Sequence, residues 1–236
     1  MTLTLSIREV VPATPRARVV RIDLAGRSFP YLPGQALLLA SHGQSRPRPY
    51  SIAAAPEDAA RDGCLELLVG VNDEGSPGPH LSLIPGTEVD IDGPLGRFTF
   101  PAGAPDPPDG QRVLFIAGGT GIAPLRAMMR HAIGLRRHRI GLLYSARTPA
   151  EFAYEGELRR LAEEGHIELK QTVTRDVGPD WNGQRGRIGP ADLAPLVHAA
   201  ATMCFVCGPP ALVDEVPRLL EGLGVPRSRI RIEEWG

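Results

Sequence analysis

The chain has 236 residues, of which 42% are hydrophobic and 22% are charged, and its formal net charge is -1. This length is too great for one small module, and we expect two compact domains. A net charge near zero provides no overall field that would attract nucleic acid or an acidic membrane surface. Lys170 is the only lysine, which excludes a phosphate loop ending in Gly-Lys-Ser/Thr and, with it, Walker-type nucleotide hydrolysis.

The three cysteines, Cys64, Cys204 and Cys207, are too few for a disulfide framework. Cys204 and Cys207 have the spacing of a redox or zinc motif, but no second pair completes a zinc site, and we expect no metal. The start of the chain lacks a cationic run followed by an apolar segment, and no stretch reaches the roughly 18 to 20 apolar residues of a membrane span. Nothing indicates export, and we expect a cytoplasmic protein.

The amino-terminal part contains short strand-like runs separated by turn-forming residues. Residues 2–7 alternate apolar and polar side chains, as is typical of a strand with one buried face. Further strands are predicted at residues 19–24, 35–40, 50–55, 64–71 and 87–91, with glycines between them. Many short strands and little helix predict an antiparallel β-barrel over residues 1–103.

Residues 101–110 are rich in proline and glycine and contain no large apolar side chain, which indicates a connector. From residue 111 to 236 strand and helix patterns alternate. Strands are predicted at residues 113–117, 140–144, 167–173, 202–206 and 230–232, and helices at 122–132, 156–164 and 211–223. Such alternation predicts an α/β domain with a parallel sheet, which binds ligands at the carboxyl ends of its strands.

A strand, a glycine turn and an amphipathic helix follow one another between Val113 and Pro124. Gly118, Gly119 and Gly121 allow backbone amides to approach a ligand closely, and the N-terminus of the helix favours a pyrophosphate. The segment departs from the Gly-x-Gly-x-x-Gly of ordinary Rossmann dehydrogenases. A tight strand-to-helix turn without a ligand is the alternative interpretation.

Arg48, Pro49, Tyr50 and Ser51 form a second candidate site at the start of a predicted strand. An arginine can pair with a phosphate, a tyrosine ring can cover a flat aromatic ligand, and a serine hydroxyl can hydrogen-bond the edge of that ligand. The alternative is an edge-strand proline beside a solvated arginine and a core tyrosine.

These segments, in this order, resemble the ferredoxin-NADP reductase family of flavin-dependent oxidoreductases over nearly the whole chain. The family uses Arg-x-Tyr-Ser for flavin, Gly-Pro-x-Gly to close the barrel, Gly-Gly-Thr-Gly-Ile-Ala-Pro for the nicotinamide dinucleotide and Cys-Gly-Pro beside the nicotinamide. Here the motifs read Arg48-Pro49-Tyr50-Ser51, Gly93-Pro94-Leu95-Gly96, Gly118 to Pro124 and Cys207-Gly208-Pro209.

The resemblance implies a role for each matching residue. It assigns Arg48 to the FAD pyrophosphate, Tyr50 to the flavin and its ribityl chain, and Ser51 to the neighbourhood of flavin N5. It assigns Cys207 to the nicotinamide C4, Glu233 to the vicinity of the flavin, and the Trp235 ring to the isoalloxazine, unless Trp235 is a frayed terminal aromatic. Ser51, Cys207 and Glu233 are the catalytic candidates, and the other cofactor-binding candidates of these motifs are Pro49, Gly118, Gly119, Thr120, Gly121, Gly208 and Pro209.

Two predicted strands of the second domain are followed by hydrogen-bond donors rather than by carboxylates. Ser145 and Arg147 follow one strand, and Thr174 and Arg175 follow the next. Arginine and hydroxyl donors suit a 2′-phosphate, whereas a bare ribose calls for an acidic acceptor. The Thr174-Arg175 pair resembles the Ser-Arg pair of NADPH-using relatives, so NADP is expected, with NAD as the alternative.

One segment departs from the family pattern. Where relatives have Gly-x-x-Ser/Thr before a leucine, with the hydroxyl on a flavin phosphate, this chain reads Gly75-Ser76-Pro77-Gly78-Pro79-His80-Leu81. Backbone amides around Gly78, or the side chains of Ser76 or His80, are the candidate replacements, and a surface histidine is the alternative interpretation of His80. The four cysteines of a plant-type iron-sulfur module, which some relatives carry, are absent from the sequence.

We therefore expect a flavin-dependent reductase that carries FAD, takes hydride from NAD(P)H and passes electrons to a separate acceptor. The expected acceptor is a redox protein, namely a ferredoxin, a flavodoxin or an oxygenase component. Reduction of free flavin or of small quinone-like compounds is one alternative. A non-catalytic subunit of an electron-transfer complex is the other.

Overall fold

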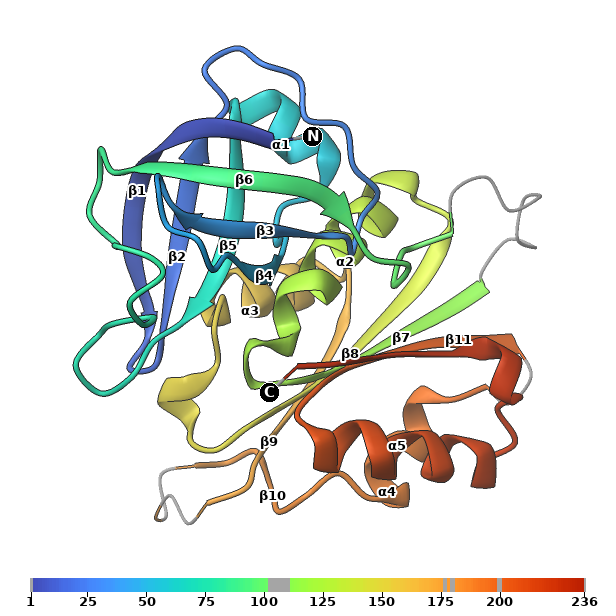
Figure 1. Ribbon diagram of the computed structural model, residues 1–236. Helices are drawn as coiled ribbons and strands as arrows, with labels where there is room; N and C mark the ends of the chain where they lie inside the picture. Colours follow the sequence, from blue (N-terminus) through green and yellow to red (C-terminus); the bar gives the residue numbers. More distant parts are fainter. Residues whose placement is uncertain (1, 102–110, 176–177, 179–180, 199–200, 236) are drawn as a thin grey trace. The chain divides into compact units, whose positions relative to one another are not determined.

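The computed structural model describes residues 2–101, 111–175, 178, 181–198 and 201–235 (Figure 1). The chain divides into two compact units. The first contains the described residues up to 101 together with Arg126–His131. The second contains the other described residues from 111 onward. Apart from Pro101, the predicted connector lies outside the described residues, and the domain limits 1–103 and 111–236 stay a prediction.

The first unit is built on six antiparallel strands in the order β4-β3-β6-β1-β2-β5. Ile52, just after β4, forms a bridge to Leu67 of β5, and the Ala53 amide donates to the Glu66 carbonyl at 2.8 Å. These contacts join the two outer strands, so the predicted antiparallel barrel is confirmed. The strands are β1 (Thr2–Thr14), β2 (Ala17–Asp23), β3 (Ala36–Ser41), β4 (Arg48–Ser51), β5 (Cys64–Gly70) and β6 (Glu88–Leu95).

Strand β1 extends to Thr14, beyond the predicted residues 2–7, and two further features of the barrel differ from the expectation. The strand predicted at 50–55 is β4 (Arg48–Ser51), and helix α1 (Pro56–Asp62), which was not expected, begins soon after it. Pro56 suits the first turn of a helix because the missing amide proton has no intrahelical acceptor there, and Gly63 ends the helix at a positive φ of 66°. The helix is only seven residues long, which explains why no periodicity revealed it.

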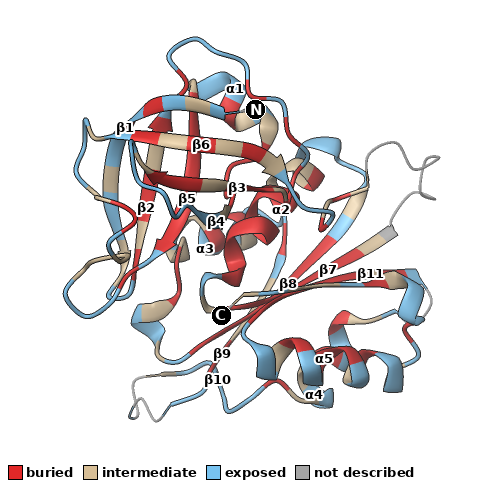
Figure 2. Ribbon diagram, viewed as in Figure 1, coloured by how far each residue is buried: buried red, intermediate tan, exposed pale blue. Residues whose placement is uncertain are grey.

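Burial alternates along β1, where Leu5 and Ile7 lie inside between exposed neighbours, whereas nearly all of β5 is buried (Figure 2). Residues 126–131 of helix α2 (Ile122–Leu135) belong to this unit. Arg126, itself buried, donates to the Glu66 carboxylate at 2.9 Å and to the Ala53 carbonyl at 2.8 Å. Because Arg21 pairs with the other Glu66 oxygen at 2.8 Å, this buried carboxylate is compensated on both sides.

The second unit holds six parallel strands in the order β10-β9-β8-β7-β11-β12, as the alternation of strands and helices predicts. Figure 1 shows α4 and α5 against one face of this sheet, with α3 on the other side. The strands are β7 (Gln111–Gly118), β8 (His138–Ala146), β9 (Glu168–Val173), β10 (Gln184–Arg185), β11 (Thr202–Gly208) and β12 (Ile230–Glu234). The remaining helices are α3 (Glu155–Glu163), α4 (Pro190–Leu193) and α5 (Pro210–Gly222).

Each strand and helix predicted for this unit is present, whereas β10 and α4 were not expected. Both are too short for a hydrophobic period, with two and four residues. The face of the sheet that carries Leu114, Ile116 and Val206 packs with Val213 and Leu220 of α5 in one apolar core. In the described part of the chain, no helix is long and apolar enough to cross a membrane.

Candidate functional site

Strand β4 carries the first candidate site at the end of the barrel sheet order. Arg48 and Pro49 are exposed, Tyr50 is half-buried and Ser51 is buried, with 7% of its surface exposed. Pro49 is tolerated because β4 pairs along its length with β3 and leaves its other edge without a continuous ladder. The strand thus presents a cation, a phenol ring and a hydroxyl at consecutive positions.

Tyr50 contacts His80, a residue from the segment between β5 and β6. The Tyr50 hydroxyl and His80 Nε2 are 2.8 Å apart, and the two rings stack with an interplanar angle of 12°. Burial raises the pKa of Tyr50, while burial and the charge of Arg48 lower the pKa of His80. At neutral pH the pair is therefore a phenol and a neutral imidazole, with the Arg48 cation nearby.

The segment that departs from the family pattern is a loop organised by its own polar groups. The Asn72 side-chain oxygen accepts hydrogen bonds from the amides of Glu74 and Ser76, at 3.1 and 2.8 Å. The Ser76 hydroxyl accepts from the Gly78 amide at 3.1 Å, and Gly78 has a φ of 110° that favours glycine. Gly75, Ser76 and Gly78 therefore share one ordered loop, in which the Ser76 hydroxyl still has its proton to donate. Which of these residues contacts a phosphate stays a prediction.

In the second unit, the glycine turn lies against the end of β11 and against Pro209, which follows that strand. A Cβ atom on Gly121 would stand 2.3 Å from the Cys207 carbonyl oxygen, and one on Gly118 would stand 2.8 Å from Pro209 Cδ. Gly208 is also confined, though less tightly, because its Cβ would lie 3.0 Å from the Gly118 Cα. The glycines of both motifs are required by this close approach of two backbones. Gly119 has a φ of 55°, and Thr120 follows it in the 3₁₀ turn Gly119–Gly121 that leads into α2.

Tyr144 is a residue of this site that the sequence did not indicate. Its side chain is fully buried near the end of β8, where its hydroxyl donates to the Gly119 carbonyl at 3.0 Å and accepts from the Ala153 amide at 3.2 Å. Burial raises the pKa of this phenol well above its usual range, so the proton stays available for the Gly119 carbonyl. Tyr144 thereby connects β8 to the glycine turn and holds the turn in place. No signal in the sequence indicated this role, because the apolar residues around Tyr144 are those expected around any core tyrosine.

The last strand brings the carboxyl-terminal candidates beside Cys207. Cys207 is paired with Glu233 in the register of β11 and β12, and the Trp235 amide donates to the Gly208 carbonyl at 3.0 Å. The Trp235 indole donates to the Glu233 carboxylate at 2.7 Å, so the tryptophan is held rather than frayed in the structure. Burial raises the pKa of both the Cys207 thiol and the Glu233 carboxyl, which makes Cys207 a neutral thiol.

The four donors predicted for a 2′-phosphate lie at adjacent strand ends. Ser145 is buried opposite Gly118 in the register of β7 and β8. The Arg175 amide donates to the Arg147 carbonyl at 3.0 Å, and the Thr174 amide donates to the Ala146 carbonyl at 3.0 Å. The side chains of Arg147 and Arg175 are exposed.

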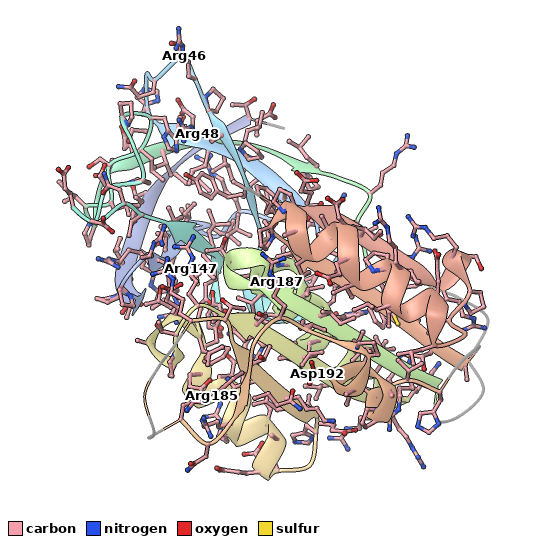
Figure 3. The ribbon with its side chains drawn as sticks, turned by 90° about the horizontal axis from the view of Figure 1, so that it is seen from below. Arg46, Arg48, Arg147, Arg185, Arg187 and Asp192 are labelled. Carbon is pink, nitrogen blue, oxygen red and sulfur yellow. The ribbon has the colours of Figure 1, made fainter. Side chains whose placement is uncertain are left out.

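Two more arginines follow in the chain, Arg185 on β10, opposite Val173 of β9, and Arg187 shortly after it. The Arg185 guanidinium donates to the carbonyls of Gly178 and Trp181, so it closes its own loop. In the view of Figure 3, Arg185 is separated from Arg147 and Arg187. Among the described residues, no comparable loop contact is seen for the Arg187 side chain.

Comparison with known proteins gives two matches to oxidoreductase families. Residues 2–100 match the family described as oxidoreductase FAD-binding domain, and residues 115–218 match the oxidoreductase NAD-binding domain. The chain is 34% identical over 240 residues to ferredoxin-NADP reductase B of Sorangium cellulosum, covering 96% of this chain and 94% of that protein. The chain belongs to the ferredoxin-NADP reductase family.

Solved structures agree with this membership. The ferredoxin reductase in carbazole 1,9a-dioxygenase superposes with a TM-score of 0.83 at 26% identity, covering 100% of this chain and 70% of that one. An Amycolatopsis cytochrome P450 reductase, GcoB, also gives 0.83, at 28% identity, with 99% of this chain and 69% of the other covered. This chain therefore spans about 70% of the length of both reductases.

As a member of the ferredoxin-NADP reductase family, the protein is an FAD-dependent NAD(P)H oxidoreductase that transfers electrons to a separate acceptor. The described residues fit FAD, since β4 offers an arginine without an ion-pair partner among them, a half-buried phenol and a buried hydroxyl. A buried His80 Nδ1 without a hydrogen-bond partner in the described residues adds a polar group beside them. The described ranges contain no group of three or more His, Cys, Asp or Glu side chains that could hold a metal ion.

Proposed function

We propose that the barrel holds FAD through β4, with Arg48 on the pyrophosphate, Tyr50 against the flavin and Ser51 at its reactive edge. The observation that carries this assignment is the cluster of Arg48, Tyr50 and His80, in which a cation lies beside a phenol with a fixed ring. A guanidinium pairs strongly with phosphate, and an aromatic ring covers a flat ligand while it excludes water. FAD supplies hydride acceptance and onward electron transfer when bound, and the protein supplies orientation.

In the second unit, we assign the pyrophosphate of the dinucleotide to Gly118, Gly119, Thr120 and Gly121. Backbone amides are accessible at glycines, and the N-terminus of α2 carries no acidic residue in its first turn that would repel an anion. Cys207 and Gly208 end β11 beside these glycines and Pro209 follows, and we assign this segment to the nicotinamide. The buried, neutral Cys207 thiol suits a role in shaping an uncharged pocket rather than in nucleophilic attack.

We also propose that Thr174 and Arg175, with Ser145 and Arg147, select NADPH. Exposed arginines at adjacent strand ends and the absence of a carboxylate at those described positions support this selection. A cytoplasmic location likewise stays a proposal, supported by three buried cysteines that are free thiols.

The proposed acceptor is a small redox protein that carries an iron-sulfur cluster or a flavin. The support comes from relatives, because the names of three of them include a ferredoxin, a dioxygenase or a cytochrome P450. These 236 residues do not contain the four cysteines of a plant-type cluster, which supports a carrier separate from this chain.

The test compares acceptors under the same NADPH supply. We would measure kcat/KM of the FAD-loaded protein with a plant-type ferredoxin, a flavodoxin, free FMN and a short-chain quinone. The proposal predicts that one of the two protein carriers gives the highest value. A higher value with free FMN or the quinone would contradict it and favour a reductase of small acceptors, whereas activity with none would indicate a non-catalytic subunit.

A further inference from the structure

His80 is fixed in the barrel from two directions. Its carbonyl accepts a hydrogen bond from the Ser41 amide at 2.9 Å, which ties its backbone to the end of β3. Its side chain is only 5% exposed and stacks on Tyr50, with the ring centroids 6.0 Å apart. The ring therefore has a defined position although it lies in the segment between two strands.

The imidazole and the phenol depend on each other for hydrogen bonding. His80 Nε2 lies 2.8 Å from the Tyr50 hydroxyl, while the buried His80 Nδ1 has no hydrogen-bond partner in the described part of the chain. Within the same residues, the Tyr50 hydroxyl has His80 as its one protein partner. The imidazole thus hydrogen-bonds Tyr50 through one nitrogen while its other nitrogen is buried without a partner. Burying a polar nitrogen in this way is costly, and an apolar side chain would fill the same space without that cost.

We propose that His80 is a positioning residue, which holds the Tyr50 ring in the orientation that contacts bound FAD. This inference rests on the proposed assignment of Tyr50 to the flavin. Tyr50 is half-buried and packs against the apolar core of the barrel, and its hydrogen bond and ring contact with His80 add a fixed point at the hydroxyl end of the ring. An anchored ring loses less conformational freedom when a ligand binds, and this preorganisation increases affinity.

The proposal also accounts for the departure from the family pattern. In place of the usual hydroxyl residue, the chain has Gly78 in a left-handed conformation and His80 two residues later. A Cβ atom on Gly78 would make an ordinary contact with His80 Nδ1 at 3.5 Å, so the positive φ of 110° rather than a lack of space favours glycine beside the imidazole. The segment thus supports the flavin site through Tyr50.

The experiment measures FAD binding by FAD-free protein, by flavin fluorescence, and the visible circular dichroism of the bound flavin. His80→Phe keeps the stacked ring and removes the hydrogen bond, Tyr50→Phe removes the same bond from the other side, and His80→Gln retains a polar group at the end of the side chain. His42→Phe is the matched control, since His42 is an exposed histidine of the same barrel that pairs with Asp90.

We expect His80→Phe and Tyr50→Phe each to weaken FAD binding about 3- to 10-fold, and the double variant to bind no more weakly than either single variant. His80→Gln should restore most of the affinity. The circular dichroism of the flavin should change in His80→Phe and stay unchanged in His42→Phe, because a change of stability alone does not alter the surroundings of a bound flavin.

Two results would overturn the proposal. One is wild-type affinity and dichroism in His80→Phe, and the other is a double variant whose loss is the product of the two single losses. If His80→Phe does not fold, Tyr50→Phe decides, since wild-type affinity there would show that the hydrogen bond contributes nothing. Tyr50→Ala distinguishes a failure of this inference from a failure of the proposed function. Wild-type FAD affinity in this variant would contradict the flavin assignment of Tyr50 itself.

Discussion

At the scale of single residues, the assignment of Arg48 to the FAD pyrophosphate gives a direct prediction. Arg48→Ala should weaken FAD binding by roughly 1.5 to 3 kcal/mol, on the order of 10- to 150-fold, because a charge-assisted hydrogen bond to phosphate is lost. Arg46→Ala is the matched control, since Arg46 is an exposed arginine two positions earlier, at the outer tip of the loop in Figure 3.

Titration of the FAD-free variants with FAD measures both affinities. An equal loss in Arg46→Ala and Arg48→Ala would mean that only diffuse positive charge matters. An unchanged affinity in Arg48→Ala would remove the residue from the site.

The second prediction at this scale concerns the choice of dinucleotide. Arg175→Ala should weaken NADPH binding by roughly 1.5 to 3 kcal/mol and leave NADH nearly unaffected, because only the 2′-phosphate requires the guanidinium. Steady-state kcat/KM with both cofactors checks it, and Arg160→Ala, an exposed arginine of α3, is the control. A wild type that prefers NADH, or an Arg175 variant that loses both cofactors equally, would show that this edge does not read the phosphate.

At the scale of elements, the close approach of the glycine turn to β11 predicts opposite effects on stability for alanine at Gly121 and at Gly134. Gly121→Ala should lower the stability of the FAD-free protein by about 1 to 3 kcal/mol or more, since a Cβ there would stand 2.3 Å from the Cys207 carbonyl oxygen. Gly134→Ala, in α2, meets nothing within 4 Å and should raise stability by about 0.5 to 1 kcal/mol. Thermal unfolding midpoints of both variants decide, and a wild-type midpoint in Gly121→Ala would refute the steric argument.

The elements also show where sequence reasoning succeeds. The strand and turn from Val113 to Gly121 are predictable because an apolar run, closely spaced glycines and a helical period are all local signals. The pairing of Tyr50 with His80 is not, because the partners are 30 positions apart and the loop has no period. Likewise, the glycines of the turn were expected to allow a ligand to approach. The structure shows that they allow the backbone at the end of β11 to pack closely against the turn.

At the scale of the whole molecule, the chain combines two units whose sheets have opposite designs. The barrel is antiparallel and presents its candidate residues on β4 and on the loop before β6, whereas the parallel sheet presents its own at strand ends. Parallel sheets bind ligands at their carboxyl edge, and the order of the two units is that of the family matches at residues 2–100 and 115–218. The function therefore requires two cofactors in one chain and does not require an acid-base triad.

The most direct test of this account is anaerobic mixing of the FAD-loaded protein with NADPH, followed by the visible absorption of the flavin. The account predicts that one equivalent of NADPH bleaches the flavin band, and that addition of an oxidised redox-protein acceptor restores it. A protein that binds FAD with a stoichiometry of one, yet keeps its flavin band unchanged with both NADPH and NADH, would contradict the account.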